Sequence, residues 1–319
     1  MRLIVTGAAG VLGSELIEQT LRADPQAEIV AVTRQSQALT QRWQGYAHIT
    51  CCAWDELERL PLADGDVIVH GAFPRQENGQ ELTEALALTG ALLKKAGTSG
   101  KEIAWVDISS RSVYGQNERT PWTETTELMP ASPYALAKAA QELLTRQAAE
   151  AYGFRYTVLR MAGLIGVGME ARLVSQMTMR AIQDRALTVM GGEQQFAMLD
   201  IRDAAAGLRA LLRKDPAEWR PLYNFGAEKA TRLKDIAPII QQEARRLYGW
   251  RVSITRQKRD AALIDEMDSS LFYAQMGWRP QYTLADTVDW LFEAYTGGGE
   301  AIDRSRTNGA GAEEALLGF

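Results

Sequence analysis

Tyr134 and Lys138 are four residues apart in the stretch 132–138, which reads SPYALAK. Ser132 followed by Pro133 predicts a helix start, because a hydroxyl is a favoured N-cap and proline suits the first helical position. Residues four apart on a helix lie on one face. A phenol beside an ammonium is stabilised as its anion, so we expect the pKa of Tyr134 to fall below its ordinary value of about 10. The pair therefore predicts a proton donor or acceptor for neutral pH, although the same spacing is also common on solvated helix faces.

A glycine-rich turn near the start of the chain supplies context for this pair. Residues 6–13 read TGAAGVLG, between an apolar strand predicted for residues 2–6 and a helix predicted for residues 14–22. A strand, a glycine turn and a helix are the context of dinucleotide binding, with phosphates at the helix N-terminus. Gly7 permits the tight turn, Gly10 the approach of a pyrophosphate, and Gly13 the packing of helix on strand. The predicted cofactor contacts are Gly7, Ala9, Gly10, Val11, Leu12 and Gly13; the alternative is a glycine turn without a ligand.

The ends of the following strands indicate which cofactor is bound. A strand predicted for residues 28–32 is followed by Thr33 and Arg34, without Asp or Glu. An acidic residue there binds the ribose hydroxyl of NAD, whereas a basic one holds the 2′-phosphate of NADP. We therefore expect NADP, with NAD as the alternative if Arg34 is only a surface charge. Asp55 follows a strand predicted for residues 47–52 and either contacts the adenine end or caps a turn. Ala72 ends a strand predicted for residues 66–72, where small residues let a cofactor lie against the backbone.

Composition excludes several other classes of protein. The 319 residues carry a net charge of −5, with no run of Lys or Arg that would indicate nucleic acid or an anionic membrane as partner. The two cysteines, Cys51 and Cys52, are adjacent, which is a poor geometry for a disulfide, and with two His residues they give no metal-site spacing. The N-terminus begins on an apolar strand without the pattern of a signal peptide. We expect a cytoplasmic protein.

Strand and helix patterns alternate through the first half of the chain. This alternation predicts an α/β fold with a doubly wound, parallel, Rossmann-type sheet and helices on both faces. Residues 1–165 are the expected dinucleotide-binding domain, to which residues 196–226 return. Residues 166–195 and 227–296 are expected to form a smaller C-terminal α/β substrate lobe, and residues 297–319 a flexible tail. His70, inside an apolar strand, is interpreted as a core histidine.

Three motifs together resemble the extended short-chain dehydrogenase/reductases, the family of nucleotide-sugar epimerases, dehydratases and keto-sugar reductases. They are the glycine turn at 6–13, SSRSVYG at 109–115 and SPYALAK at 132–138, in the family's order and separation. The resemblance implies that Tyr134 is the general acid/base, and that Lys138 lowers its pKa and holds the nicotinamide ribose. It also implies that Ser110 hydrogen-bonds the reacting oxygen, with Ser109 as the alternative. It further suggests a homodimer through helices 82–96 and 134–149.

Departures from the family pattern narrow the reaction. The 4,6-dehydratases carry an Asp-Glu pair where this chain has Arg111 and Ser112, so dehydration is not expected. Ala87 stands where many members have an active-site Asn. UDP-sugar epimerases carry an Asn and an Arg near the substrate diphosphate, at the positions where this chain has Met161-Ala162-Gly163 and Phe196-Ala197. We therefore expect an NADP-dependent reductase of a keto-sugar or related polar ketone. The alternatives are an NAD(P)-dependent nucleotide-sugar epimerase and a non-catalytic NAD(P)-binding regulatory protein.

Substrate contacts are the least determined part of the site. Four candidates carry a positive charge, and the fifth is an aromatic residue close to a predicted turn. They are Arg111, Arg172, Lys258 and Arg259, and Phe196. For the charged ones the alternative is a solvated surface position, and for Phe196 it is filling of the core. We expect a small-molecule substrate, no metal, no nucleic acid and no membrane.

Overall fold

The computed structural model describes residues 1–34, 36–74, 78–115, 117–258 and 264–297, without the side chains of residues 36–38. The predicted tail beyond Gly297 and the candidate Arg259 lie outside the described residues. The chain forms two compact units. Unit 1 comprises Met1–Met161, Ala204–Phe225 and Ser269–Arg279, and unit 2 comprises Ala162–Asp203, Gly226–Asp268 and the described residues from Pro280 onward. Within the ranges described, no helix is long and apolar enough to cross a membrane.

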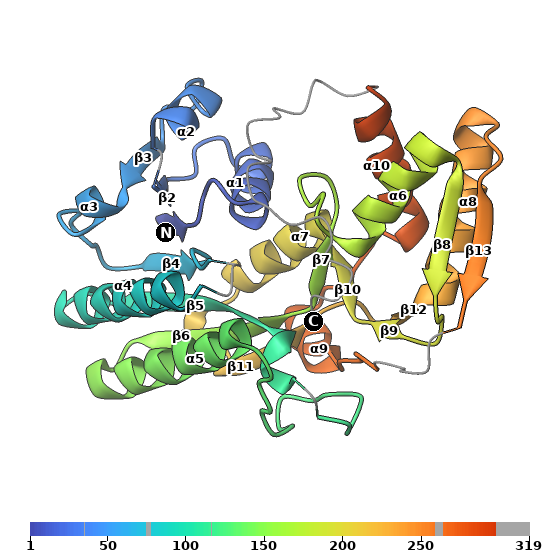
Figure 1. Ribbon diagram of the computed structural model, residues 1–319. Coiled ribbons are helices and arrows are strands. Elements are labelled where there is room, and N and C mark those ends of the chain that lie inside the picture. The colour runs from blue at the N-terminus through green and yellow to red at the C-terminus, as the bar shows by residue number, and fades with distance from the viewer. Residues whose placement is uncertain (35, 75–77, 116, 259–263, 298–319) are drawn as a thin grey trace. The chain divides into compact units, whose positions relative to one another are not determined.

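Unit 1 is built on one parallel sheet of seven strands, which confirms the predicted doubly wound fold. Its strands lie in the order β11-β6-β5-β4-β1-β2-β3 (Figure 1). Their sequences are short apolar runs, as expected for strands buried on both faces. Their bounds are β1 Leu3–Thr6, β2 Ile29–Thr33, β3 Ile49–Ala53, β4 Asp66–His70, β5 Ile103–Ser110, β6 Arg155–Met161 and β11 Leu222–Phe225.

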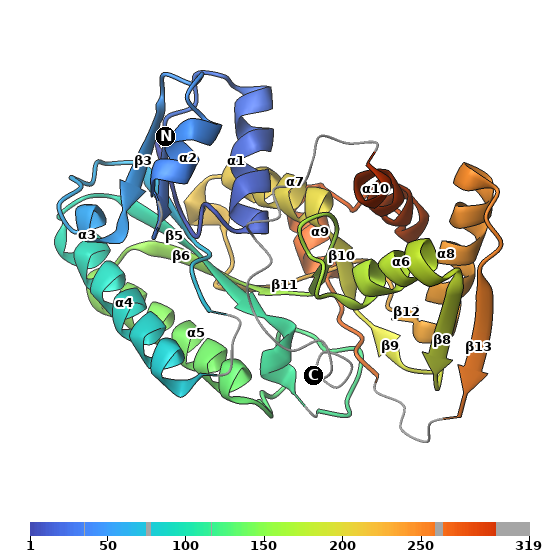
Figure 2. The same cartoon turned by 45° about the horizontal axis from the view of Figure 1, so that its top comes forward.

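Helices cover both faces of this sheet. Helix α4 (Gly79–Thr98) and helix α5 (Pro133–Tyr152) lie side by side on one face, and α1 (Val11–Ala23) lies on the other (Figures 1 and 2). The shorter helical pieces of unit 1 are α2 Ser36–Arg42, α3 Trp54–Leu57, η1 Arg111–Tyr114, η2 Pro216–Glu218 and α9 Ser270–Met276. Helix α7 (Ile201–Leu212) begins in unit 2 and continues in unit 1.

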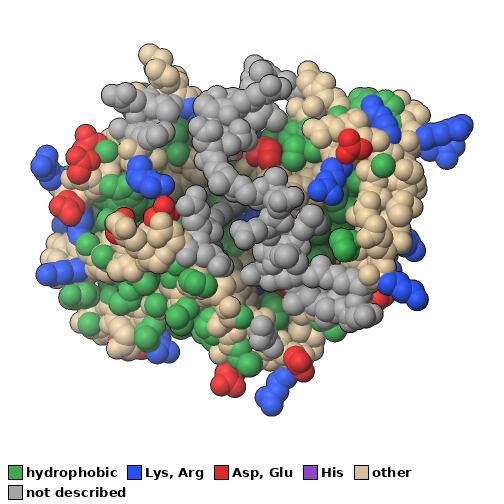
Figure 3. All heavy atoms as spheres, in the orientation of Figure 1, with side chains coloured by type: hydrophobic (Ala, Val, Ile, Leu, Met, Phe, Trp, Pro, Cys, Tyr) green, Lys and Arg blue, Asp and Glu red, His purple; other side chains and the backbone are tan. Residues whose placement is uncertain are grey.

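The start of α5 has the chemistry that the sequence predicts. Ser132 is the N-cap and its hydroxyl accepts a hydrogen bond from the Ala135 amide at 3.2 Å, with proline at the first helical position. Leu136, Leu143 and Leu144 on this helix are exposed by 62%, 50% and 39% of their surface. Hydrophobic side chains gather over the region of α4 and α5, at the lower left of Figure 3. These leucines of α5 are therefore on its outer side, whereas its buried residues include the polar Lys138, Gln141, Glu142 and Thr145.

Unit 2 is a smaller α/β unit with its own apolar core. Helices α6 (Leu173–Asp184), α8 (Leu233–Tyr248) and α10 (Leu284–Thr296) enclose a cluster that includes Val174, Ile240 and Phe292. Three pairs of strands complete it: β8 (Ala186–Met190) with β13 (Ser253–Gln257), β7 (Gly163–Ile165) with β10 (Met198–Asp200), and β9 (Gln195–Phe196) with β12 (Thr231–Arg232). This arrangement confirms the second, smaller α/β part of the predicted fold.

Some predicted boundaries are wrong. The sequence of residues 194–201 predicts a single strand. In the structure this segment is divided at Ala197, because its halves have different partners: β9 pairs antiparallel with β12, and β10 pairs parallel with β7. Asp203 is predicted to be the cap or a first-turn acid of the next helix, and it does lie in the first turn of α7. Its carboxylate accepts hydrogen bonds from the amides of Gln281 and Tyr282, both at 2.9 Å. Strands β2 and β3 begin at Ile29 and Ile49, later than predicted.

The turn after β1 holds α1 close to the sheet. A Cβ on Gly13 would lie 2.4 Å from the Gly7 carbonyl oxygen, and one on Gly7, whose φ is +73°, would lie 2.9 Å from the backbone of Gly71 and Ala72. Any side chain at Gly13 would therefore push the start of α1 away from the turn.

We expect Gly13→Ala to lower the free energy of unfolding by roughly 1–3 kcal/mol, because the added methyl overpacks against backbone. Gly90→Ala is the matched control. It is also a helical glycine, and among the described residues a Cβ there meets no heavy atom within 4 Å, so the change should stabilise by about 0.5–1 kcal/mol. Urea unfolding of both variants measures the difference, and an equal effect would contradict the packing argument.

Candidate active site

The order of the strands reverses between β1 and β4. In open α/β sheets, ligands bind at the carboxyl ends of the strands at such a point. The glycine turn follows β1, and Gly71 and Ala72 follow β4. The two loops touch through backbone: the Gly71 amide donates to the Thr6 carbonyl at 3.2 Å, and the Ala72 amide to the Thr6 hydroxyl at 3.3 Å. The predicted contacts Gly7, Gly10, Gly13 and Ala72 therefore belong to one edge of the sheet.

His70 fixes this edge from within the core. Its Nε2 lies 2.9 Å from the Thr89 hydroxyl, which itself donates to the Ala85 carbonyl at 2.8 Å. Nε2 is therefore the donor, and Nδ1 accepts from the Thr6 hydroxyl at 2.9 Å. Burial, with a smaller contribution from the charge of Lys138, lowers the pKa of His70 to about 3. The ring is a neutral structural group, which confirms the interpretation as a core histidine.

Lys138 is buried at the carboxyl end of the sheet. Its side chain is only 3% exposed, and its ammonium donates to the Ile108 carbonyl at 2.8 Å and to Gln141 Oε1 at 2.9 Å. The ammonium also lies 4.0 Å from the centre of the Phe73 ring, which in turn meets Tyr134 edge-on at 6.1 Å. Tyr134 is half-buried on the same helix. Phe73 thus links the two predicted residues from the loop after β4, a role that the sequence did not predict.

Ser110 ends β5 and caps η1. Its Oγ accepts two hydrogen bonds from Ser112, one from the amide at 3.2 Å and one from the hydroxyl at 3.0 Å. The neighbouring Ser109 instead points into the core, where it donates to Glu142. This difference in direction supports Ser110 over Ser109 as the hydroxyl available to a ligand.

Beneath these residues lies a buried polar network. The Glu142 carboxylate pairs with Arg160 at 2.7 Å, and Arg160 donates to the Tyr114 hydroxyl at 3.0 Å. Tyr114 donates to the side chain of Asn224 on β11. Burial raises the pKa of the Tyr114 phenol, and Arg160 opposes part of that rise. The network joins α5, β6, η1 and β11, so it holds the helix of Tyr134 to the sheet.

Asp107 is a second buried carboxylate, in the middle of β5. It accepts hydrogen bonds from Gln141 and, at 2.9 Å, from Thr145. Burial raises the pKa of Asp107 to about 6, although the charge of Lys138 and the Thr145 hydrogen bond act in the opposite direction. No motif in the sequence points to Asp107. The signal that could have found it is a charged side chain inside the otherwise apolar run 103–108.

The remaining candidates are placed as follows. Ala9 belongs to the glycine turn, and Val11 and Leu12 to the start of α1. Arg34 is exposed directly after β2, and Asp55 is exposed in the first turn of α3, after β3. Arg111 is half-buried in η1. Arg172, at the N-cap of α6, and Lys258, after β13, are exposed in unit 2, where Phe196 packs on the apolar cluster. Ala87 lies on the exposed side of α4.

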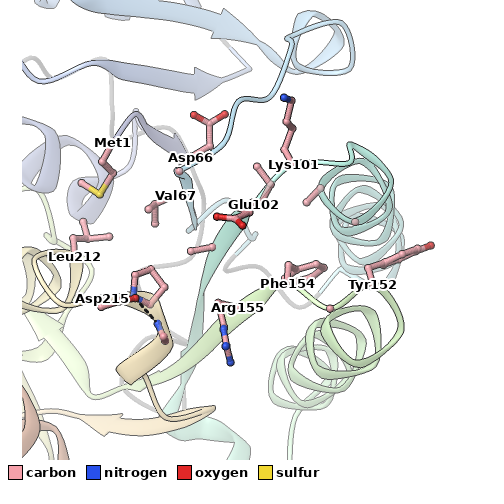
Figure 4. A pocket seen from close by; sticks show the side chains of 18 of the residues that line it. Met1, Asp66, Val67, Lys101, Glu102, Tyr152, Phe154, Arg155, Leu212 and Asp215 are labelled. Atoms are coloured by element: carbon pink, nitrogen blue, oxygen red, sulfur yellow. Dashed lines mark hydrogen bonds between the residues drawn. The ribbon is translucent and has the colours of Figure 1, made fainter.

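A hollow of about 630 Å³ lies at the opposite end of the strands of unit 1 (Figure 4). Its lining includes Asp66, Ile103 and Arg155, which are the first residues of β4, β5 and β6. Ser110 is the last residue of β5. The hollow carries charges of both signs, and its Asp66 is paired with Arg2 at 2.6 Å. It is therefore separate from the candidate active site.

Comparison with known families agrees with this geometry. The model of the NAD-dependent epimerase/dehydratase family matches residues 3–226. The chain belongs to this family. The match confirms the resemblance to extended short-chain dehydrogenase/reductases, and it covers the strands, turn and helix that carry the glycine, Ser110 and Tyr134 motifs.

Individual relatives of the family are distant in sequence. A dTDP-glucose 4,6-dehydratase of Streptomyces griseus is 23% identical over 90% of this chain and 93% of its own length. A trifunctional UDP-glucose 4,6-dehydratase/UDP-4-keto-6-deoxy-D-glucose 3,5-epimerase/UDP-4-keto-L-rhamnose-reductase of Arabidopsis thaliana is 23% identical over 74% of this chain, which spans 38% of that enzyme. The crystal structure of UDP-glucose 4-epimerase from Thermotoga maritima superimposes with a TM-score of 0.75, at 20% identity, over 93% of this chain and 99% of that one. The structural likeness establishes the fold.

His70 and Asp107 should give opposite pH dependences of stability. The folded-state pKa of His70 is lowered from 6.5 to about 3, so stability falls as the pH drops below 6.5. The folded-state pKa of Asp107 is raised from 3.8 to about 6, so stability falls as the pH rises through 6. From pH 8 to pH 5, His70→Gln should gain roughly 2 kcal/mol relative to wild type, and Asp107→Asn should lose roughly 1–2 kcal/mol. Urea unfolding at the two pH values tests this, and changes of the same sign would contradict it.

Proposed function

We propose that the protein is an NADP-dependent oxidoreductase that reduces a ketone, a keto-sugar or a related polar carbonyl, with Tyr134 as the proton donor. The observation that carries the proposal is the buried ammonium of Lys138 on the helix of Tyr134, beside the end of the strand that carries Ser110. Burying a charge is costly unless it is paired. The buried position of this lysine is therefore best explained by a role in binding or catalysis at the carboxyl edge of the sheet.

In this proposal the residues of the chain transfer one proton to the substrate and stabilise the groups that take part in the transfer. Tyr134 gives its phenolic proton to the substrate oxygen, and the ammonium of Lys138 stabilises the phenolate that remains. Ser110 donates a hydrogen bond to the same oxygen, because its own acceptor positions are taken up by Ser112. The bound nicotinamide would supply the hydride to the carbonyl carbon.

The glycine turn fits the diphosphate of such a cofactor. Gly10 is the N-cap of α1 and has no side chain with which to cap the first amides. These amides and the helix dipole favour an anion. Gly7, Ala9, Gly10, Val11, Leu12 and Gly13 would hold the diphosphate, Ala72 would lie against the cofactor, and Lys138 would hold the ribose. Arg34 would hold a 2′-phosphate, and Asp55 would lie at the adenine end. NAD is the alternative cofactor, and it is favoured by the NAD dependence for which the family is named.

The type of reaction rests on the residues beside Ser110. The relative from Streptomyces griseus is a 4,6-dehydratase, but here Arg111 and Ser112 stand where the dehydratases have two acids. A reductase needs no second acid beside Tyr134. The second candidate is a nucleotide-sugar epimerase, because the Thermotoga maritima enzyme has the same fold. A cofactor that stays bound through purification, with no net oxidation of added NADPH, would identify an epimerase. Binding without any turnover would identify a regulatory protein.

Unit 2 is the proposed substrate-binding part, and the 1–165 region with 196–226 the cofactor-binding part. Arg172, Phe196 and Lys258 are proposed substrate contacts from unit 2, and Arg111 from unit 1. The proposed assembly is a homodimer through α4 and α5, supported by the exposed Leu136, Leu143 and Leu144.

We expect Tyr134→Phe to lower turnover by about 10²–10⁴-fold, because the proton donor is lost while the ring is kept. NADPH oxidation across a panel of keto-sugars and keto-acids measures turnover, and fluorescence titration should give an unchanged Kd for NADPH. Tyr152→Phe, the same change at the far end of α5, is the control and should keep full activity. Retained turnover in Tyr134→Phe would refute the mechanism.

Arg34→Asp should weaken NADPH binding by about 10–100-fold, since a charge-assisted hydrogen bond to the 2′-phosphate would be lost. NADH binding should change by less than about threefold. Arg22→Asp makes the same change of charge in the last turn of α1 and should affect neither cofactor. Titration of all three proteins with both cofactors tests the assignment, and an equal loss for NADPH and NADH would contradict it.

A further inference from the structure

Asp107 receives both of its hydrogen bonds from α5. Gln141 donates through Nε2 to one carboxylate oxygen, and Thr145, one turn later, donates through its hydroxyl to the other. All three side chains are fully buried. A buried carboxylate is tolerated only when its oxygens are satisfied. The position of Asp107 under α5 is therefore specific to these two donors.

Gln141 joins this carboxylate to Lys138. Its amide oxygen accepts from the Lys138 ammonium at 2.9 Å, while its amide nitrogen faces Asp107. An ionised carboxylate only accepts and an ammonium only donates. One orientation of the amide satisfies both neighbours, and the flipped amide would satisfy neither. Asp107 in its charged form thus fixes the amide that holds Lys138.

We propose that Asp107 and Gln141 are positioning residues for Lys138, and that protonation of Asp107 releases this hold. The inference rests on the proposed function, in which Lys138 binds the cofactor and assists Tyr134. The Ile108 carbonyl, 2.8 Å from the ammonium, is the second point of attachment and carries no titratable group. Of these two hydrogen bonds of the ammonium, the one to Gln141 is therefore the one that depends on pH.

The charges around Asp107 come from three elements. Lys138 and Glu142 face it from α5, with opposite effects on its pKa. His70 is its neighbour in β4, and stays neutral because its own pKa is lowered to about 3. Arg160 on β6 is neutralised by Glu142 at 2.7 Å. Burial is the largest effect and raises the pKa of Asp107 to about 6, so the change of state falls within the range in which enzymes are assayed.

Protonation changes what Gln141 can do. A proton on the oxygen that faces Gln141 requires the amide to turn its oxygen toward Asp107, which takes that acceptor from Lys138. A proton on the other oxygen requires Thr145 to become an acceptor, and the negative charge opposite the ammonium is lost. In either case the hold on Lys138 weakens below about pH 6.

The test is NADPH binding between pH 5 and pH 8.5, followed by fluorescence, together with kcat and KM for a ketone that wild type reduces. Relative to wild type at each pH, Asp107→Asn should bind NADPH about 3–10-fold more weakly at pH 8 and equally at pH 5. The ratio of variant to wild type removes the titration of the 2′-phosphate itself, which lies near pH 6. The kcat of Asp107→Asn should likewise be lower than that of wild type at pH 8 and equal to it at pH 5, and KM should differ less.

Gln141→Met and Thr145→Val separate positioning from packing. Gln141→Met keeps the side-chain volume but removes the hydrogen bonds that join Lys138 to Asp107. It should weaken NADPH binding about tenfold at pH 8, and the titration of Asp107 should no longer weaken its binding as the pH falls. Thr145→Val removes a donor from Asp107 without touching Lys138, so it should keep the binding at pH 8 within about threefold and move the acid limb to higher pH. If Asp107→Asn does not fold, these two variants decide the question.

A constant ratio of Asp107→Asn to wild type at all pH values, or an unmoved acid limb in Thr145→Val, would overturn the inference. If wild type binds NADPH normally, either of these two results would overturn this inference but not the proposed function. Failure of wild type to bind NADPH or NADH would instead refute the proposed function, and this inference with it.

Discussion

The burial of the Lys138 ammonium is the constraint on which the carboxyl edge of the sheet depends. The ammonium of a lysine that is only 3% exposed must find acceptors within the protein. It finds a backbone carbonyl of β5, the amide of Gln141 and the face of Phe73. These three partners come from β5, α5 and the loop after β4. The position of one charge therefore fixes how a helix, a strand and a loop meet.

Helix α5 consequently turns its polar side inward. Its buried residues include Gln141, Glu142 and Thr145, while Leu136 and Leu143 are exposed. Polar networks of this kind are stable only when every member is satisfied. Here the Glu142–Arg160 pair and its neighbours fulfil that condition. Apolar packing holds the rest of the sheet, but hydrogen bonds hold the helix that carries Tyr134.

Local chemistry in the sequence was enough to predict the strands, the glycine turn and the start of α5, because each depends on neighbours in the chain. The role of Ser110 comes instead from the resemblance of its motif to the family, and it stays a prediction. The inward polar side of α5 could not be predicted, since an apolar stripe on a helix ordinarily faces the core. The roles of Phe73 and Asp107 depend on side chains far away in the sequence. The break at Ala197 depends on two strands that are likewise remote.

The hydroxyl of Ser110 connects the structure to the type of reaction. Because Ser112 donates to it from both its amide and its hydroxyl, the proton of Ser110 is directed away from Ser112. A site with Ser110 and Tyr134 as donors is suited to a single oxygen that gains negative charge. Removal of water from a neighbouring carbon needs a further acid, and Arg111 and Ser112 supply none. Under the proposed function, the residues around the phenol serve a carbonyl that becomes a hydroxyl, a reaction without a leaving group.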